Sequence, residues 1–216
     1  MSTPAKLAML LVIAFVIAIG GVLLLDGSDE TTPVSGQEAD NRVVRDDSRI
    51  LGAKGSSDVV LTEFLDFECE ACGAAFPIIE DLRQKYDGEV TFVARYFPLP
   101  GHFNAERAAR AVESAARQDK FLEMYQLMYE TQREWGEQQS PADDVFRGFA
   151  EQLDLDMEQF DTDYSSEEVA ERVQRDVDDG MALGVKGTPT FFLNGERFEP
   201  QQIEDFDAAI DELLAK

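Results

Sequence analysis

Residues 63–77 read EFLDFECEACGAAFP, and this stretch decides how the rest of the chain is interpreted. It contains the only two cysteines among the 216 residues, Cys69 and Cys72. An apolar, strand-like run at 59–67 precedes them, and a helix-like run at 71–86 follows them. The N-terminus of a helix presents unpaired backbone N–H groups and a partial positive charge, and both stabilise a thiolate. The pattern therefore predicts a reactive dithiol at the junction of a strand and a helix.

Two other uses of a cysteine pair fit this sequence poorly. A bond between residues three apart closes a very small loop, so it removes little entropy from the unfolded chain and is a poor structural staple. A structural zinc site needs four Cys or His ligands, whereas the chain has two Cys and one His. We therefore expect no metal site, and no cofactor other than a redox-active Cys69–Cys72 disulfide.

The composition limits the number of domains and the classes of partner. Asp and Glu number 44 against 19 Lys and Arg, which gives a net charge of −25. Proteins that bind nucleic acid carry basic patches, so we expect no nucleic-acid partner. The same charge argues against peripheral docking on anionic lipid. The roughly 165–175 residues that follow the N-terminal segments suffice for one domain with a hydrophobic core.

The N-terminal region predicts a membrane anchor. Residues 7–25 contain no charged side chain, and a helix of that length spans about 28 Å, close to the hydrocarbon core of a bilayer. Lys6 precedes this run and Asp26 follows it, so the positive-inside rule places residues 1–6 in the cytoplasm and the rest of the chain outside. A cleaved signal peptide is the alternative, although its apolar region is usually shorter and ends at a small-residue cleavage site.

The remaining sequence divides into a tether and a folded domain. Residues 26–41 are polar without an apolar period and predict a flexible tether. Residues 42–216 show a β-α-β pattern, a helical block at about 104–184, and then a β-β-α pattern. This order predicts an α/β fold with a mixed sheet, helices on its faces and an inserted helical subdomain. The run at 42–50, with its apolar pair of valines at 43–44, predicts an edge strand, and Ser-Pro at 140–141 predicts the start of a helix.

A turn motif and a proline mark the C-terminal part of this domain. Asn-Gly at 194–195 separates the apolar runs 190–193 and 197–198, which is the strongest short-range signal for a β-hairpin. Pro189 directly precedes the first run, and a proline in this position can simply begin a strand. Residues 201–214 predict an amphipathic helix that follows the hairpin.

These features together resemble a known family. The element order, the CxxC motif at the first strand–helix junction and the sequence GTP at 187–189 before a hairpin are similar to thioredoxin-fold proteins. The long helical insertion narrows the resemblance to the DsbA-like thiol:disulfide oxidoreductases. The sequences EFLDFECEAC and GTPTFFLNG resemble those of membrane-anchored bacterial members, and the resemblance covers about residues 42–216. One departure is Glu70, which stands where many relatives have proline.

The resemblance implies a role for each matching position. Cys69 corresponds to the exposed nucleophile, Cys72 to the buried resolving thiol, and Pro189 to a cis-proline beside the dithiol. Thr188 would then pair through its backbone with an extended client peptide. Glu63 corresponds to a buried acid beneath the dithiol and would exchange a proton with Cys72. From the residues alone, a solvent-facing position on an edge strand is the alternative for Glu63.

The sequence thus predicts an enzyme, an extracytoplasmic thiol:disulfide oxidoreductase anchored in the cell membrane by a single span. We expect it to oxidise cysteine pairs in secreted or envelope proteins. The alternatives are a reductase or isomerase of the same fold, and a non-catalytic, membrane-tethered binding or chaperone module. The expected partners are unfolded or secreted client proteins and a membrane redox partner that reoxidises or reduces the dithiol. The chain itself is expected to be a monomer.

Charged residues near the dithiol lead to one more hypothesis. Asp66, Glu68 and Glu70 lie within three residues of Cys69, and like charges at such short range oppose a thiolate. They predict a higher pKa for Cys69 than in relatives with a less acidic motif, and therefore a milder oxidant. The single histidine, His102, follows a Pro-Gly pair and is expected to be a loop residue, with a catalytic base as the alternative.

Overall fold

The computed structural model describes residues 41–216, which form the architecture discussed below. The predicted cytoplasmic tail at 1–6, the predicted anchor at 7–25 and nearly all of the predicted tether at 26–41 lie outside them. Within the described part of the chain, no helix combines the length and the apolar character needed to cross a membrane.

A mixed β-sheet forms the centre of the described domain. Its strands are β1 (Arg49–Ile50), β2 (Val60–Leu65), β3 (Thr91–Tyr96), β4 (Thr190–Leu193) and β5 (Glu196–Phe198), in the spatial order β1-β3-β2-β4-β5. Strand β2 runs parallel to β3 and antiparallel to β4, with Glu63 opposite Ala94 on one side and Phe191 on the other. Because β2 lies inside the sheet with both faces covered, its sequence is almost continuously apolar.

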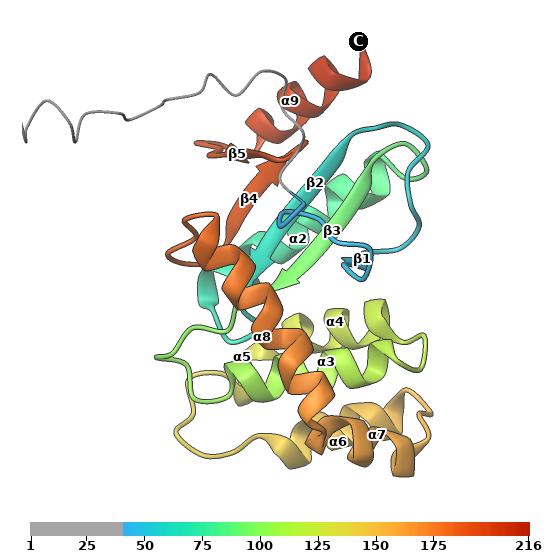
Figure 1. Cartoon of the computed structure of the whole chain (residues 1–216), viewed down its shortest axis with the longest axis vertical. Coiled ribbons are helices and arrows are strands. Elements are labelled where there is room, and N and C mark those ends of the chain that lie inside the picture. The colour runs from blue at the N-terminus through green and yellow to red at the C-terminus, as the bar shows by residue number, and fades with distance from the viewer. Residues whose placement is uncertain (1–40) are drawn as a thin grey trace, which may run out of the picture. The chain divides into compact units, whose positions relative to one another are not determined.

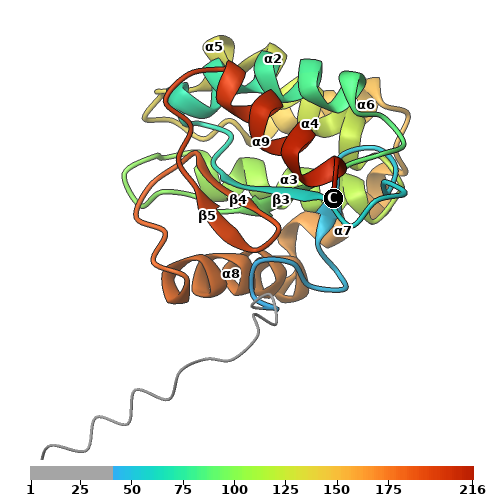
Figure 2. The same cartoon turned by 90° about the horizontal axis from the view of Figure 1, so that it is seen from above.

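Helices cover both faces of the sheet (Figures 1 and 2). They are α2 (Glu70–Lys85), α3 (Ala105–Ala116), α4 (Phe121–Glu130), α5 (Gln132–Trp135), α6 (Asp143–Gln152), α7 (Met157–Ser165), α8 (Glu167–Ala182) and α9 (Glu204–Leu214). Figure 2 shows α2 and α9 on one face of the sheet and α8 on the other. Helices α3 to α8 come between β3 and β4 in the chain, so the domain has the predicted thioredoxin-type order with an inserted helical region.

The two faces of the sheet have separate hydrophobic cores. Leu61 and Leu65 belong to the larger core, which also contains Cys72 and the buried side of α2, whereas Phe64 belongs to the smaller core. Side chains alternate between the two faces along a strand. Glu63 therefore points to the same side as Leu61 and Leu65, and this register places a carboxyl group in the core that holds the dithiol.

A buried ionic network joins the inserted helices to the sheet. The side chains of Arg95 in β3 and Asp176 in α8 are both fully buried and pair at 2.8 Å, and Arg95 also contacts Asp179 at 2.6 Å. Arg95 donates a further hydrogen bond to the backbone carbonyl of Val43. The edge strand predicted within residues 42–50 is confirmed as the short β1, which pairs with β3 at the edge of the sheet, whereas Val43 is buried in the smaller core without forming a strand.

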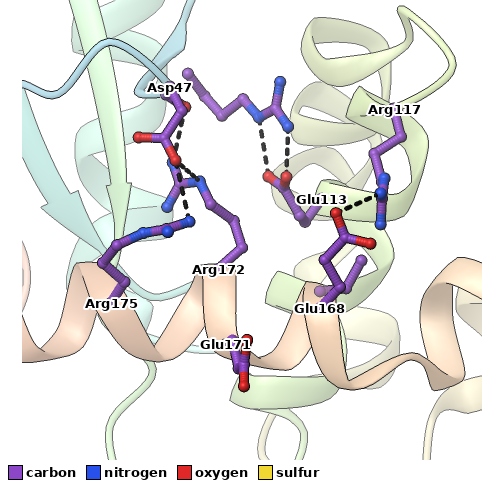
Figure 3. A pocket seen from close by; sticks show the side chains of 9 residues that line it. Asp47, Glu113, Arg117, Glu168, Glu171, Arg172 and Arg175 are labelled. Carbon is purple, nitrogen blue, oxygen red and sulfur yellow. Dashed lines mark hydrogen bonds and ion pairs between the residues drawn. The ribbon is translucent and has the colours of Figure 1, made fainter.

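A charged pocket of about 340 Å³ lies between β1, α3 and α8 (Figure 3). Each arginine that lines it is paired with a carboxylate: Arg49 with Glu113, Arg117 with Glu168, Arg172 with Asp176, and Arg175 with Asp47. These ion pairs nearly balance the charge of the pocket. They also link β1 and the two helices to one another. Its lining residues come from elements that carry neither cysteine.

The helix predicted to begin at Ser140 starts instead at Asp143, with Ala142 as its N-cap residue. The cause is Asn104, whose side chain donates to the carbonyl oxygen of Ser140 at 3.0 Å and accepts from the backbone N–H of Ala142 at 3.0 Å. These bonds hold the two residues in a loop, which the Ser-Pro pattern does not reveal.

Candidate active site

Cys69 and Cys72 lie at the N-terminus of α2, as the sequence predicts, and both are reduced in the structure. Cys69 is the N-cap residue and has 7% of its surface exposed, whereas Cys72 in the first helical turn has 1% exposed. The backbone N–H groups of residues 71 and 72, in the first turn of α2, help to lower the pKa of Cys69. Cys69 is therefore the more accessible sulfur and the one that the helix N-terminus stabilises as an anion.

The two thiols differ strongly in acidity. A hydrogen bond from the Cys72 thiol lowers the pKa of Cys69 to about 5, with further contributions from the Thr188 side chain and the helix N-terminus that outweigh burial. Burial raises the pKa of Cys72 far above its ordinary value, and the bond to Cys69 and the charge of Glu63 raise it further. At neutral pH the reduced site therefore holds a Cys69 thiolate and a Cys72 thiol.

Glu63 lies beneath the dithiol with only 4% of its surface exposed. Burial raises the pKa of its carboxyl group to about 8, and the charge on Cys69 adds to this effect. The carboxyl group is thus largely protonated at neutral pH, close enough to Cys72 for its charge to influence that thiol. The burial excludes the alternative of a solvent-facing edge residue for Glu63.

The loop before β4 forms the other side of the site. The peptide bond between Thr188 and Pro189 is cis, and the sulfur of Cys69 lies 3.4 Å from the carbonyl oxygen of Thr188, to which it donates when it is protonated. Thr190 closes the loop by donating from its hydroxyl group to the carbonyl oxygen of Gly187 at 2.8 Å. The fold thus brings all four residues predicted for catalysis, together with Thr188, into one site.

The acidic residues that precede Cys69 bind backbone groups of distant loops. The Asp66 carboxylate accepts from the backbone N–H of Glu68 at 2.8 Å, and the Glu68 carboxylate accepts from the backbone N–H groups of Asn104 and Glu137 at 2.6 and 3.1 Å. Both carboxylates therefore anchor backbone loops, and the pKa of Cys69 is lowered rather than raised from its ordinary value. The comparison with less acidic relatives stays a prediction.

Gln132 in α5 contributes to the site without having been predicted. Its side-chain amide donates to the carbonyl oxygens of Phe67 and Cys69 at 2.7 and 2.9 Å. The same side chain packs against Gly73, where an added Cβ atom would lie 2.1 Å from the Gln132 Oε1 atom. The helical insertion thereby holds the turn that presents Cys69. A glycine inside a predicted helix was the one sequence signal of this close approach.

An apolar groove of about 300 Å³ begins beside the dithiol. It is lined by Ala71, which lies between the two cysteines, by Ile78 of α2, by Phe191 of β4 and by Ile203, 54% of whose surface is exposed. Exposed apolar side chains gathered in a groove are typical of a binding surface. The sequence does not reveal this groove, because three separate elements form it only in the folded chain.

A thiolate at a helix N-terminus beside a buried thiol is the machinery of disulfide exchange. The thioredoxin-type sheet and its inserted helices place that machinery in a particular class, the DsbA-like thiol:disulfide oxidoreductases. A family model described as Thioredoxin matches residues 45–212. The chain belongs to this family.

Solved structures share the fold at low sequence identity. α-DsbA1 from Wolbachia pipientis superposes with a TM-score of 0.69 at 17% identity, over 79% of this chain and 92% of that one. A periplasmic thioredoxin-like protein from Salmonella enterica serovar Typhimurium gives a TM-score of 0.65 at 20% identity, over 84% of this chain and 99% of that one. Matches of this extent take in most of the described domain.

Among curated proteins, the Na(+)/H(+) antiporter NhaA 3 from Salinispora tropica is 41% identical over 154 residues. The match covers 70% of this chain but only 22% of the antiporter. The chain thus spans about a fifth of the length of this curated relative.

Proposed function

We propose that this chain oxidises cysteine pairs in secreted or envelope proteins through its Cys69–Cys72 disulfide. The observation that carries the proposal is the position of Cys69 at the N-terminus of α2 beside the buried Cys72, an arrangement in which the pKa of Cys69 is lowered to about 5. A stable thiolate favours the reduced form of the dithiol, so the disulfide form readily accepts electrons from other thiols. This direction of exchange distinguishes an oxidase from the alternative reductase.

Exchange begins when a client thiolate attacks the Cys69 sulfur of the disulfide. A bond forms between the client and Cys69, the Cys69–Cys72 bond breaks, and Cys72 leaves with the electron pair as a thiolate. Because burial raises the pKa of Cys72, this thiolate takes up a proton. Glu63 lies beneath it with a pKa of about 8 and is able to supply that proton at neutral pH.

The second half of the reaction releases the client. Another client thiolate attacks the client sulfur in the mixed disulfide, which forms the client disulfide and frees Cys69 as a thiolate, a good leaving group because of its low pKa. Two electrons have then passed from the client to the Cys69–Cys72 pair. A membrane redox partner that carries a disulfide of its own accepts these electrons by a further exchange and restores the site.

The surroundings of the dithiol suit an extended client segment. The backbone of Thr188 lies beside Cys69, where it offers hydrogen bonds of the kind used when a peptide adds to a strand. The apolar groove that begins at Ala71 would receive apolar side chains of the same segment. Unfolded proteins expose such segments together with their thiols, and folded proteins do not.

The proposal also places the domain outside the cytoplasm, held by the apolar segment at 7–25. Disulfides persist in extracytoplasmic compartments and are rare in the reducing cytosol. The structurally similar Salmonella protein is described as periplasmic. The antiporter relative suggests a narrower choice of partner, a membrane transport protein, because in that chain a similar stretch belongs to a much longer transporter.

The reduction potential of the purified chain, equilibrated with glutathione, tests the direction of exchange. A value near about −120 mV supports the oxidase, whereas a value near about −270 mV supports the reductase. The variant C72A should accumulate mixed disulfides with clients, whose identification tests the membrane-protein candidate. Disulfide turnover by C69S would overturn the scheme, and a wild-type chain that exchanges no disulfide would favour the non-catalytic module.

A further inference from the structure

The only histidine of the chain contacts Asp66, in the turn that leads to the dithiol, although it is distant from that turn in sequence. His102 is in the loop between β3 and α3, and its Nδ1 atom lies 2.6 Å from the Oδ2 atom of Asp66. The Asp66 side chain is fully buried, whereas 24% of the His102 side chain is exposed. The same carboxylate accepts from the backbone N–H of Leu99 at 2.9 Å, and the backbone N–H of His102 donates to the carbonyl oxygen of Leu99 at 3.0 Å. The ring is thus fixed in place.

Asp66 also contacts the dithiol through its backbone. The N–H of Cys69 donates to the carbonyl oxygen of Asp66 at 3.2 Å, and the backbone of Asp66 also lowers the pKa of Cys72. Asp66 therefore contacts the imidazole with its side chain and Cys69 with its main chain. A change in the charge of the imidazole or of Cys69 therefore acts on the other group over a short, rigid and largely buried distance.

The charges around His102 favour its protonated form. Burial lowers the pKa of the imidazole, but the hydrogen bond and charge of Asp66 outweigh this effect, and the charges of Cys69 and Glu68 raise the pKa further. The titratable and charged groups that face the ring are Asp66, Glu68 and Cys69 from the turn before α2, and Glu106 and Arg107 from the start of α3. Helix α8 contributes neutral side chains to the pocket that His102 lines.

We propose that His102, held by Asp66, is a positioning residue for disulfide exchange, whose imidazolium stabilises the Cys69 thiolate and whose protonation is linked to the redox state of the dithiol. The proposal rests on the proposed exchange at Cys69. In this proposal the β3–α3 loop supplies the positive charge near Cys69. The two residues between the cysteines cannot supply it, because neither carries a positive charge.

The linkage has a definite direction. In the reduced protein the Cys69 thiolate favours the imidazolium, and formation of the Cys69–Cys72 disulfide removes that negative charge. By reciprocity, the thiolate raises the proton affinity of His102 by the factor with which the imidazolium raises the acidity of Cys69. Oxidised glutathione takes two electrons from the dithiol and becomes two glutathione thiols. His102 then binds its proton less tightly, so at a pH near the pKa of His102 a fraction of the molecules release that proton.

The imidazole NMR signals of the full chain, prepared without a histidine tag, test this linkage directly, because a single histidine gives unambiguous signals. Against pH, we expect the His102 midpoint in the reduced protein to lie above that in the oxidised protein by at least about threefold in proton affinity. Reduced C69S, which lacks the thiolate, should match the oxidised protein. Equal midpoints in the oxidised and reduced wild-type chains would overturn the proposal.

A second measurement reads the coupling from the other side. In H102Q the thiolate absorbance of Cys69 should appear at a higher pH than in the wild type, whereas H102Q that titrates like the wild type contradicts the proposal. The NMR comparison needs no variant of His102, so it remains decisive if H102Q folds poorly. Failure of the proposed oxidase function would appear in client oxidation assays and would leave the NMR comparison unaffected.

Discussion

The side-chain amide of Gln132 donates to the carbonyl oxygen of Cys69 at 2.9 Å, across 63 residues of sequence. Through this contact the inserted helical region takes part in the active site. The sheet and α2 place the dithiol at a helix N-terminus, and Gln132 fixes the turn that presents the nucleophilic sulfur. The close packing of Gln132 on Gly73 makes the contact testable.

Substitution Q132A should destabilise the protein by about 1–3 kcal/mol, because the carbonyl oxygens of Phe67 and Cys69 lose a donor. G73A should have a similar cost in the wild-type background, since its Cβ atom displaces the Gln132 side chain. Denaturant unfolding of the single variants measures both effects.

The double variant provides the control for this interaction. Without the Gln132 side chain, alanine at 73 meets no obstacle and is a better helix former than glycine by roughly 0.5–1 kcal/mol. We therefore expect G73A to destabilise the wild type but to stabilise Q132A. Additive effects of the two substitutions would show that the packing of Gln132 on Gly73 does not matter.

The acidity of Cys69 gives a second prediction. Thiolate absorbance of the reduced chain should rise with a midpoint near pH 5, in line with the lowered pKa of this thiol. In C72A the midpoint should move upward, because the hydrogen bond from the Cys72 thiol makes the largest contribution to the lowered pKa. C69S should show no transition in this range, and a wild-type midpoint above pH 8 would contradict the assignment of Cys69 as the thiolate.

Local patterns were sufficient to predict the elements around the dithiol. The apolar run of β2, the CxxC motif and the Asn-Gly hairpin each depend on neighbours in sequence, and the structure places all three as predicted. The burial of Glu63 could not be derived in this way, because it depends on which face of the sheet receives α2. The family resemblance, rather than the sequence pattern of β2, indicated that Glu63 is buried on the face of the sheet that carries the dithiol.

Long-range contacts account for what the sequence failed to predict. The partners of the carboxylates around the CxxC motif could not be predicted from the sequence, because Asp66 and Glu68 bind loops more than thirty residues away. Gln132 and the apolar groove likewise depend on elements that meet only in the folded protein. No local pattern marks a residue whose partners lie in another part of the chain.

The buried ionic network gives a third prediction. D176N should destabilise the protein by about 3–5 kcal/mol, because it leaves the guanidinium of Arg95 buried without its full complement of negative charge. The matched control is D178N, an exposed position on the same helix, where a change within about 0.5 kcal/mol is expected. Urea unfolding compares the two variants, and equal stabilities would show that the network is dispensable.

The buried carboxyl group of Glu63 gives a prediction about pH. Its pKa in the folded protein is about 8, against an ordinary value of 4.5, so between these pH values the folded state keeps a proton that the unfolded state has lost. Stability associated with Glu63 is therefore fully present below about pH 4.5 and is lost as the pH rises towards 8. E63Q removes this loss, so its stability relative to the wild type should increase over that range by roughly 2–4 kcal/mol.

Denaturant unfolding at a series of pH values tests this expectation, with E89Q at an exposed position as the control that should follow the wild-type profile. The gain in E63Q should be larger in the reduced protein than in the oxidised protein, because the charge on Cys69 contributes to the raised pKa of Glu63 and disappears when the disulfide forms. Stability profiles of E63Q and wild type that run parallel from pH 5 to 8 would mean that Glu63 is not held as a buried acid. In that case Cys72 would need another source for its proton.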